Sequence, residues 1–146
     1  MSTAEDFAEV IAVLFSNCQE KENRYVRKYG ISIVDGRCLR ILHTHKSLTV
    51  NHLAQHMTLT SSRITRIVDR LVEKKLVIRR ACTSDRRIFN LLLTAAGKKL
   101  AAVIIEDSIR IHEEILASFS PEDRVNVIRI LKKLNNSVEK WLKQHV

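Results

Sequence analysis

Basic and hydroxyl side chains gather on one face of a helix predicted over residues 61–74. At about 100° per residue, Ser62 and Arg66 lie opposite the apolar stripe of this helix, and Arg63 lies beside them. Such side chains can donate hydrogen bonds to phosphates and to base edges in the major groove of DNA. The candidate DNA-contacting residues of this helix are Ser61, Ser62, Arg63, Thr65, Arg66 and Arg70.

A second basic group follows in a predicted hairpin. Arg86 and Arg87 belong to a loop between two expected strands, residues 77–80 and 88–93. A basic hairpin directly after such a helix is a wing, and its natural target is the minor groove of DNA or the phosphates beside it.

The positive charge of the chain is concentrated around these two groups. The 146 residues carry a formal net charge of +9, and residues 61–90 hold nine bases against three acids. Residues 95–146 are nearly balanced, with nine bases and seven acids. Because the charge is focused, it indicates an anionic partner rather than general solubility.

The remaining pattern predicts the elements that position these groups. Apolar residues recur at helical spacing over residues 4–27, after Ser32, and over residues 50–57, 94–117 and 121–144. The two short helices before the wing are typical of a helix-turn-helix, whose second helix enters the major groove. The predicted fold class is mainly α, an α+β winged helix-turn-helix with a two-strand wing. The expected helix-capping residues are Ser32, Thr49, Thr60 and Ser120.

Long apolar helices at both ends of so small a chain need a partner surface. The first predicted helix carries an apolar stripe of Phe7, Val10, Ile11, Leu14, Phe15 and Cys18. Self-association is the simplest way to cover such helices, so we expect a homodimer. Gly36 lies inside the second helix, where a glycine costs about 1 kcal/mol relative to alanine, and the sequence offers no reason for it.

From Leu48 to Leu100 the sequence resembles the MarR/SlyA family of winged-helix regulators. The resemblance is carried by TRIVDRL at residues 65–71 and by DRR at residues 85–87, with LT following at residues 93–94. The chain departs from the family at two turns, where members often have glycine. It has Thr58 in the helix-turn-helix turn and Lys75 before the first wing strand.

The resemblance implies that different parts of the chain have different functions. Residues 33–94 would form the DNA-binding region, and residues 1–32 plus 95–146 the helical dimerisation region. A homodimer would bind a pseudo-palindromic operator in double-stranded DNA, with half-sites about 10 bp apart. The family also implies repression that a small-molecule effector relieves, through a ligand site that the sequence does not identify.

The resemblance also assigns roles to individual side chains. Ser62, Arg63, Thr65 and Arg66 would face bases or adjacent phosphates, and Arg86 or Arg87 would enter the minor groove. Asp85 is expected to orient an arginine of the wing, because a carboxylate that faced phosphate would be repelled.

Other chemistry finds less support in the sequence. His52 and His56 are spaced to hold zinc, but no third ligand is suggested nearby, and we predict no metal site. The sequence contains no Gly-rich phosphate loop and no GxSxG motif, so we expect neither an enzyme nor a cofactor.

Two alternatives stay open. Cys18 and Cys38 are expected to be small core hydrophobes, whereas Cys82 lies in the basic wing, where nearby positive charge favours a thiolate. The protein could therefore be a redox-sensing regulator that acts through Cys82. A winged helix can also serve as a protein- or RNA-interaction module.

The sequence also carries signals of location. No apolar run approaches the roughly 20 residues needed to cross a bilayer, and the first ten residues, MSTAEDFAEV, carry acids instead of a basic signal-peptide start. We expect a cytoplasmic protein with no membrane partner.

Overall fold

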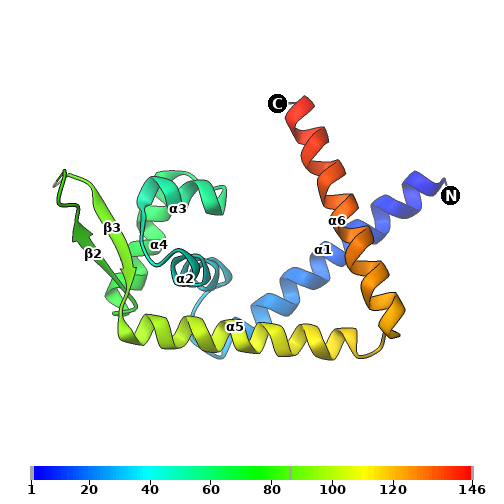
Figure 1. Ribbon diagram of the computed structural model, residues 1–146, viewed down its shortest axis with the longest axis horizontal. Coiled ribbons are helices and arrows are strands. Elements are labelled where there is room, and N and C mark those ends of the chain that lie inside the picture. Colours follow the sequence, from blue (N-terminus) through cyan, green and yellow to red (C-terminus); the bar gives the residue numbers. More distant parts are fainter. Residues whose placement is uncertain (1, 86, 146) are drawn as a thin grey trace. The chain divides into compact units, whose positions relative to one another are not determined.

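In the computed structural model, which describes residues 2–85 and 87–145, the chain folds into six helices and three short strands (Figure 1). The helices are α1 (Thr3–Arg27), α2 (Ile33–His45), α3 (Val50–Met57), α4 (Ser61–Glu73), α5 (Ala95–Leu116) and α6 (Pro121–Gln144). The strands are β1 (Leu48–Thr49), β2 (Val77–Ala81) and β3 (Phe89–Leu93). The predicted mainly α winged helix-turn-helix fold is confirmed.

Helix ends lie where the local capping signals place them. Ser32 and Asp35 form a reciprocal capping box at the start of α2, and Thr49 and Thr60 cap α3 and α4. Each cap supplies an acceptor to amides that lack a partner within the helix. Because α3 ends at Met57 and α4 begins at Ser61, only a short turn separates the two helices of the helix-turn-helix.

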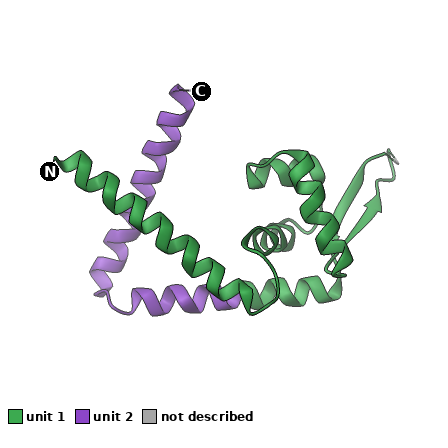
Figure 2. Cartoon of the chain, turned by 180° about the vertical axis from the view of Figure 1, so that it is seen from behind, with its two compact units in different colours: residues 1–105 green, residues 106–146 purple. Residues whose placement is uncertain are grey.

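The chain divides into two compact units, residues 1–105 and 106–146 (Figure 2). The core of the first unit lies among α2, α3, α4 and the sheet. Its largest fully buried side chains include Leu39, Leu42, Leu53, Met57, Ile64, Leu71, Leu91 and Ile104. The DNA-binding region of residues 33–94 stays a prediction.

The sheet has one strand more than the sequence predicted. Its order is β1-β3-β2, and both pairings are antiparallel. Leu48 and Thr49 of β1 pair with Leu91 and Asn90 of β3, so β3 is the central strand. The predicted two-strand wing is therefore joined, along the middle of β3, by a third strand that directly precedes α3.

The two turns that depart from the family pattern keep a left-handed backbone. Thr58 has φ 55° and Lys75 has φ 58°. An L-residue pays about 1–2 kcal/mol for this conformation, and the β-branched side chain of Thr58 fits it poorly. The turns before and after α4 thus keep their geometry at the cost of local strain.

The packing around Gly36 leaves room for a methyl group. A Cβ at this position would lie 3.4 Å from Cγ1 of Val26 and 3.6 Å from Cδ1 of Ile31. Both neighbours are buried, but these are ordinary contact distances to side-chain atoms, so the structure gives no steric reason for the glycine.

A steric constraint occurs where α5 begins. Thr94 Oγ1 donates a hydrogen bond to the carbonyl oxygen of Lys75 (2.8 Å) and accepts one from the amide of Gly97 (3.0 Å). A Cβ on Gly97 would collide with the carbonyl oxygen of Leu76. Because that neighbour is backbone, it cannot move aside as a flexible side chain could.

The apolar stripe of α1 is exposed in the single chain. Phe7, Val10, Leu14 and Phe15 are 44–64% exposed. Cys18 is exposed as well, so the expectation that it belongs to the core is wrong. A stripe at helical spacing predicts that a surface is available for burial, but it does not say which partner covers that surface.

The second unit contains the end of α5 and all of α6. Ser120 caps α6, Pro121 stands in its first turn, and Glu122 and Asp123 lie at its positive end. None of the described α6 side chains is buried. Large apolar side chains of α6 are about half exposed at Val125, Ile128, Leu131, Val138 and Trp141. No helix in the described ranges is long and apolar enough to cross a membrane.

The two glycines should respond differently to an added methyl group. We expect Gly97→Ala to lower the free energy of unfolding by about 2 kcal/mol or more, because it overpacks against backbone. Gly36→Ala is the matched control, since its new Cβ would meet movable side chains at ordinary contact distance. Urea unfolding followed by circular dichroism measures both, and equal losses would contradict this assignment.

Candidate nucleic-acid interface

The rotation of α4 about its own axis is fixed by its buried stripe. Ile64, Val68 and Leu71 are fully buried and Ile67 is 5% exposed. The opposite face is exposed, and its residues are Ser61, Ser62, Arg63, Thr65 and Arg66. All of the residues predicted to read bases therefore lie on one outward surface.

The hydroxyl groups on this face are held by local hydrogen bonds. Ser61 Oγ donates to Oδ1 of Asn51 on α3 (2.9 Å), and Thr65 Oγ1 donates to the carbonyl oxygen of Ser61 (2.9 Å). The guanidinium groups of Arg63 and Arg66 have no hydrogen bond or ion pair with any described residue. Their donors are therefore available to an external acceptor.

Arg70 is placed differently from the other predicted contacts. Its Nη2 lies 2.8 Å from Oδ1 of Asp35 on α2, and the Asp35 side chain is only 4% exposed. The structure thus directs at least one end of the Arg70 guanidinium toward the protein interior.

An ion pair also joins α4 to the wing. Arg79 Nη2 on β2 lies 2.6 Å from Oδ1 of Asp69. The sequence pattern did not predict this pairing. The residues are ten apart, and the pattern alone does not show that the hairpin returns over α4.

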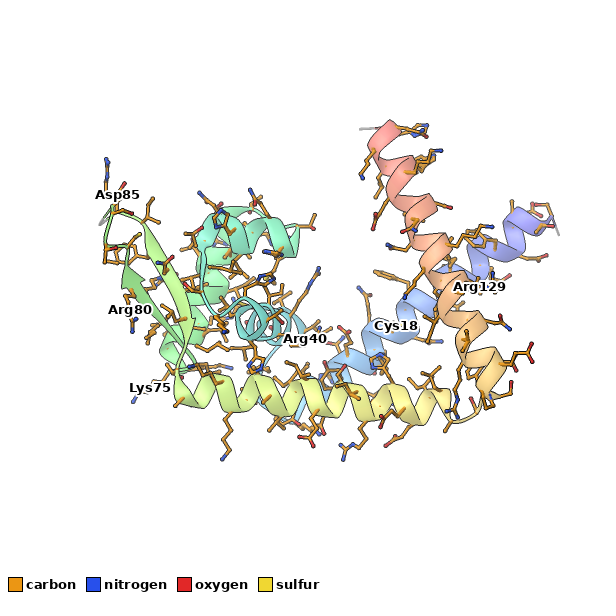
Figure 3. All side chains as sticks on the ribbon, viewed as in Figure 1. Cys18, Arg40, Lys75, Arg80, Asp85 and Arg129 are labelled. Atoms are coloured by element: carbon orange, nitrogen blue, oxygen red, sulfur yellow. The ribbon has the colours of Figure 1, made fainter. Side chains whose placement is uncertain are left out.

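Asp85, predicted to orient an arginine of the wing, contacts Arg87. Asp85 Oδ1 accepts a hydrogen bond from the backbone amide of Arg87 (2.9 Å) and lies 3.3 Å from its Nε. The Arg87 side chain is 92% exposed. Figure 3 shows Asp85 at the hairpin tip and Arg80 on β2. Arg86, predicted to enter the minor groove, lies outside the described residues.

A groove of about 490 Å³ lies between α4, the start of α3 and the wing. Thr65 and Asp69 line it from α4, and Arg79 and Arg87 line it from the hairpin. The charge of Arg79 is paired with Asp69, and the exposed Arg87 lies 3.3 Å from Asp85. Guanidinium groups that line such a groove can bind the phosphates of an anionic strand.

The three cysteines differ in environment. Burial, with a smaller contribution from nearby Asp35, raises the pKa of Cys38 to about 12. Hydrogen bonding to Ser84, first through its side chain and then through backbone amides at Ser84 and Asp85, lowers the pKa of Cys82. The Sγ of Cys82 lies 3.2 Å from the Ser84 hydroxyl. Nearby arginines suggested a reactive Cys82, but the structure assigns the shift to these local hydrogen bonds.

In the structure, His56 lies next to His45, which is not the His52–His56 pairing that the sequence spacing suggested. The rings of His45 at the end of α2 and His56 on α3 have centroids 4.3 Å apart. Within residues 2–85 and 87–145, no three His, Cys, Asp or Glu side chains are arranged to hold a metal ion.

Comparison with known proteins matches this geometry. Residues 31–89, from the α1–α2 turn to the start of β3, match the model of the MarR family. Transcription regulators with this kind of helix-turn-helix align along most of the chain. The chain belongs to the MarR family. It is a transcriptional regulator of that family.

Two relatives of this MarR-family chain come from Bacillus subtilis (strain 168). The HTH-type transcriptional repressor MdtR is 28% identical over 136 residues, which is 93% of this chain and 88% of the relative. The HTH-type transcriptional regulator MhqR is 24% identical over 132 residues, covering 90% of this chain and 91% of the relative.

Solved structures share the fold of this MarR-family chain. Streptococcus pneumoniae FabT in complex with DNA has a TM-score of 0.85 at 20% identity, over 94% of this chain and 98% of FabT. The Staphylococcus aureus MepR–DNA complex has a TM-score of 0.77 at 21% identity, over 90% of this chain and 97% of MepR.

The contrast between the cysteines can be measured by alkylation. Lowering the pKa of Cys82 increases its thiolate fraction at a given pH, so its rate of reaction with iodoacetamide should reach half-maximum at a lower pH than that of a cysteine in an unfolded peptide. Cys38 should stay unlabelled until the protein unfolds. Mass spectrometry of tryptic peptides measures both rates.

Ser84→Ala provides the control for this prediction. Removal of the hydroxyl should move the pH profile of Cys82 upward and leave Cys38 unchanged. An identical Cys82 profile in both proteins would rule out the Ser84 hydrogen bond as the cause.

Proposed function

We propose that this regulator binds double-stranded DNA as a homodimer and represses transcription until a small-molecule effector releases it. The observation that carries the proposal is the exposed, acid-poor face of α4 beside a wing with an exposed arginine. Arg63 and Arg66 present free guanidinium groups there, and Arg87 extends the basic surface onto the hairpin. Arginine pairs with guanine edges and with phosphates, which makes DNA the matching partner.

Related proteins support the same partner. FabT and MepR were crystallised with DNA, and MdtR is named a transcriptional repressor. Repression is therefore the favoured direction of control for this chain.

Homodimer formation is supported by apolar surface that the single chain leaves uncovered. Phe15 of α1 is 64% exposed and Trp141 of α6 is 57% exposed, and similar side chains flank each of them. Burial of apolar area contributes about 25 cal/mol per Å², so a second copy is the simplest partner for these helices. Residues 1–32 and 95–146 would then supply the dimerisation region.

A hollow in the first unit is the site we propose for the effector. It has a volume of about 430 Å³ and is lined by Leu42, Lys46, Leu92 and Lys98, together with His43 and Leu93. Its leucine and lysine side chains favour a small apolar molecule that carries a negative charge. The dimer would have two conformations that differ in the distance between the two recognition helices. The effector would act by binding one of these conformations more tightly than the other.

Oxidation of Cys82 is a second candidate signal. The hydrogen bonds that lower the pKa of this thiol favour it, because the thiolate is the form that oxidants attack. Loss of DNA binding after treatment with hydrogen peroxide, absent in Cys82→Ser, would identify this route rather than ligand binding.

The first experiment is selection of bound duplexes from a random DNA library at physiological salt. We expect enrichment of an inverted repeat with half-sites about one helical turn apart. Retention of duplexes without enrichment would contradict sequence-specific recognition. Failure to retain DNA would favour the protein- or RNA-interaction module.

Variants of two arginines then separate base reading from phosphate binding. Arg66→Ala should relax sequence preference and cost about 1–3 kcal/mol in operator binding. Arg87→Ala should weaken binding to all sequences and reduce the slope of log K against log[salt] by about one. Fluorescence anisotropy over a salt series measures both quantities. Equal, sequence-independent losses would mean that α4 does not read bases.

A further inference from the structure

We propose that Asp35 is a positioning residue for the DNA-reading helix: through Arg70, it fixes α4 to the junction between α1 and α2. The inference rests on the proposed function, because it assigns α4 the task of reading DNA. It gives Arg70 a role different from the direct contact that its place on a basic helix face suggests.

Two contacts tie the last turns of α4 to residues 30–35. Asp35 accepts a hydrogen bond from Arg70 Nη2 through Oδ1 (2.8 Å) and from the Ser32 amide through Oδ2 (3.2 Å). Lys74 Nζ donates to the carbonyl oxygen of Gly30. The α1–α2 junction and the C-terminal half of α4 are therefore held together by charged groups at two points.

The burial of Asp35 makes its pairing more important than an ordinary surface ion pair. Its side chain is 4% exposed, whereas the carboxylate of Glu20, paired with Arg24, is 55% exposed. A buried carboxylate that loses its partner carries an uncompensated charge in a medium of low dielectric constant, whereas an exposed pair is screened by water and salt. Although the Arg70 side chain is 46% exposed, the buried carboxylate makes the Asp35–Arg70 contact costlier to break than the Glu20–Arg24 pair.

The junction is also packed firmly against α1. Tyr25 and Val26 in the last turn of α1 are buried, and Cγ1 of Val26 lies next to Gly36 at the start of α2. A movement of α1 is consequently transmitted to α2 and, through Asp35 and Arg70, to α4. Since α1 carries the exposed apolar stripe proposed for dimerisation, the pair would link the geometry of the dimer to the orientation of the reading helix.

A double-mutant cycle tests this assignment on the duplex selected by the wild-type protein. The variants are Asp35→Asn, Arg70→Gln and the combination. Asparagine keeps the shape of aspartate and an acceptor for the Ser32 amide. We expect each single variant to weaken binding about 5- to 100-fold, the usual range for coupling through a protein. The double variant should bind DNA at least as tightly as the single variant with the lower affinity. The slope of log K against log[salt] should be the same for all variants and the wild type.

A direct phosphate contact by Arg70 would give a different result. Arg70→Gln would then lower the salt slope by about one, Asp35→Asn would leave affinity near that of the wild type, and the two effects would add. Any of these three results would overturn the proposal.

Two control variants accompany the double-mutant cycle. Arg66→Gln lies one turn earlier on the same helix, is exposed, and should change the sequence preference. Glu20→Gln breaks the exposed ion pair with Arg24 and should leave affinity within about twofold of the wild type, because exposed pairs contribute little.

A DNA-free readout separates this inference from the proposed function. Backbone amide chemical shifts of ¹⁵N-labelled protein should change along α4 in Asp35→Asn while those of α5 stay constant. Unchanged α4 shifts would overturn the positioning role even if the variants bound DNA weakly. If wild-type protein bound no duplex, the proposed function would fail, whereas the shifts would still decide whether Asp35 positions α4.

Discussion

The burial of one stripe of α4 is the constraint on which the proposed DNA-binding surface depends. A rotation of this helix by one residue, about 100°, would expose Ile64 and Val68 and bury charged neighbours. Burying a side chain of that size is worth about 1.5–3 kcal/mol, so the rotation would cost several such contributions. The stripe therefore determines which side chains face outward, and it sets Asp69 and Arg70 on the flanks, where each meets its ion-pair partner.

The wing is held by a complementary arrangement. β3 is the central strand of the sheet, and its residues Leu91 and Leu93 are buried, so the base of the hairpin belongs to the core. The tip is polar and exposed, and Arg79 connects the middle of the hairpin to α4. A rigid base with an exposed basic tip lets Arg87 extend from the molecule without loosening the elements that support it.

Much of this architecture could be predicted because its signals are local. Caps and apolar stripes lie within a few residues of the helices that they define, and the bounds of α3 and α4 followed from Thr49 and Thr60. The missed features depend on distant partners. β1 has only two residues and exists because β3 pairs with it. Asp35 and Arg70 are 35 positions apart, and neither residue type reveals the other.

The same distinction explains why the sequence misled us about Cys18 and did not mark Gly97 as important. Cys18 belongs to a regular apolar stripe, but periodicity does not say whether the same chain or a second copy covers the stripe. Gly97 has no visible role in the sequence. Its requirement comes from the carbonyl group of Leu76, which approaches only after β2 and α5 have come together.

The strained turns at Thr58 and Lys75 lie immediately before and after the segment that contains α4. Each left-handed residue costs about 1–2 kcal/mol, and such strain persists only where the surrounding structure holds the backbone in place. The buried stripe of α4, with Ile64, Val68 and Leu71 in the core, therefore supports the strained residues at both ends of the segment as well as the helix itself.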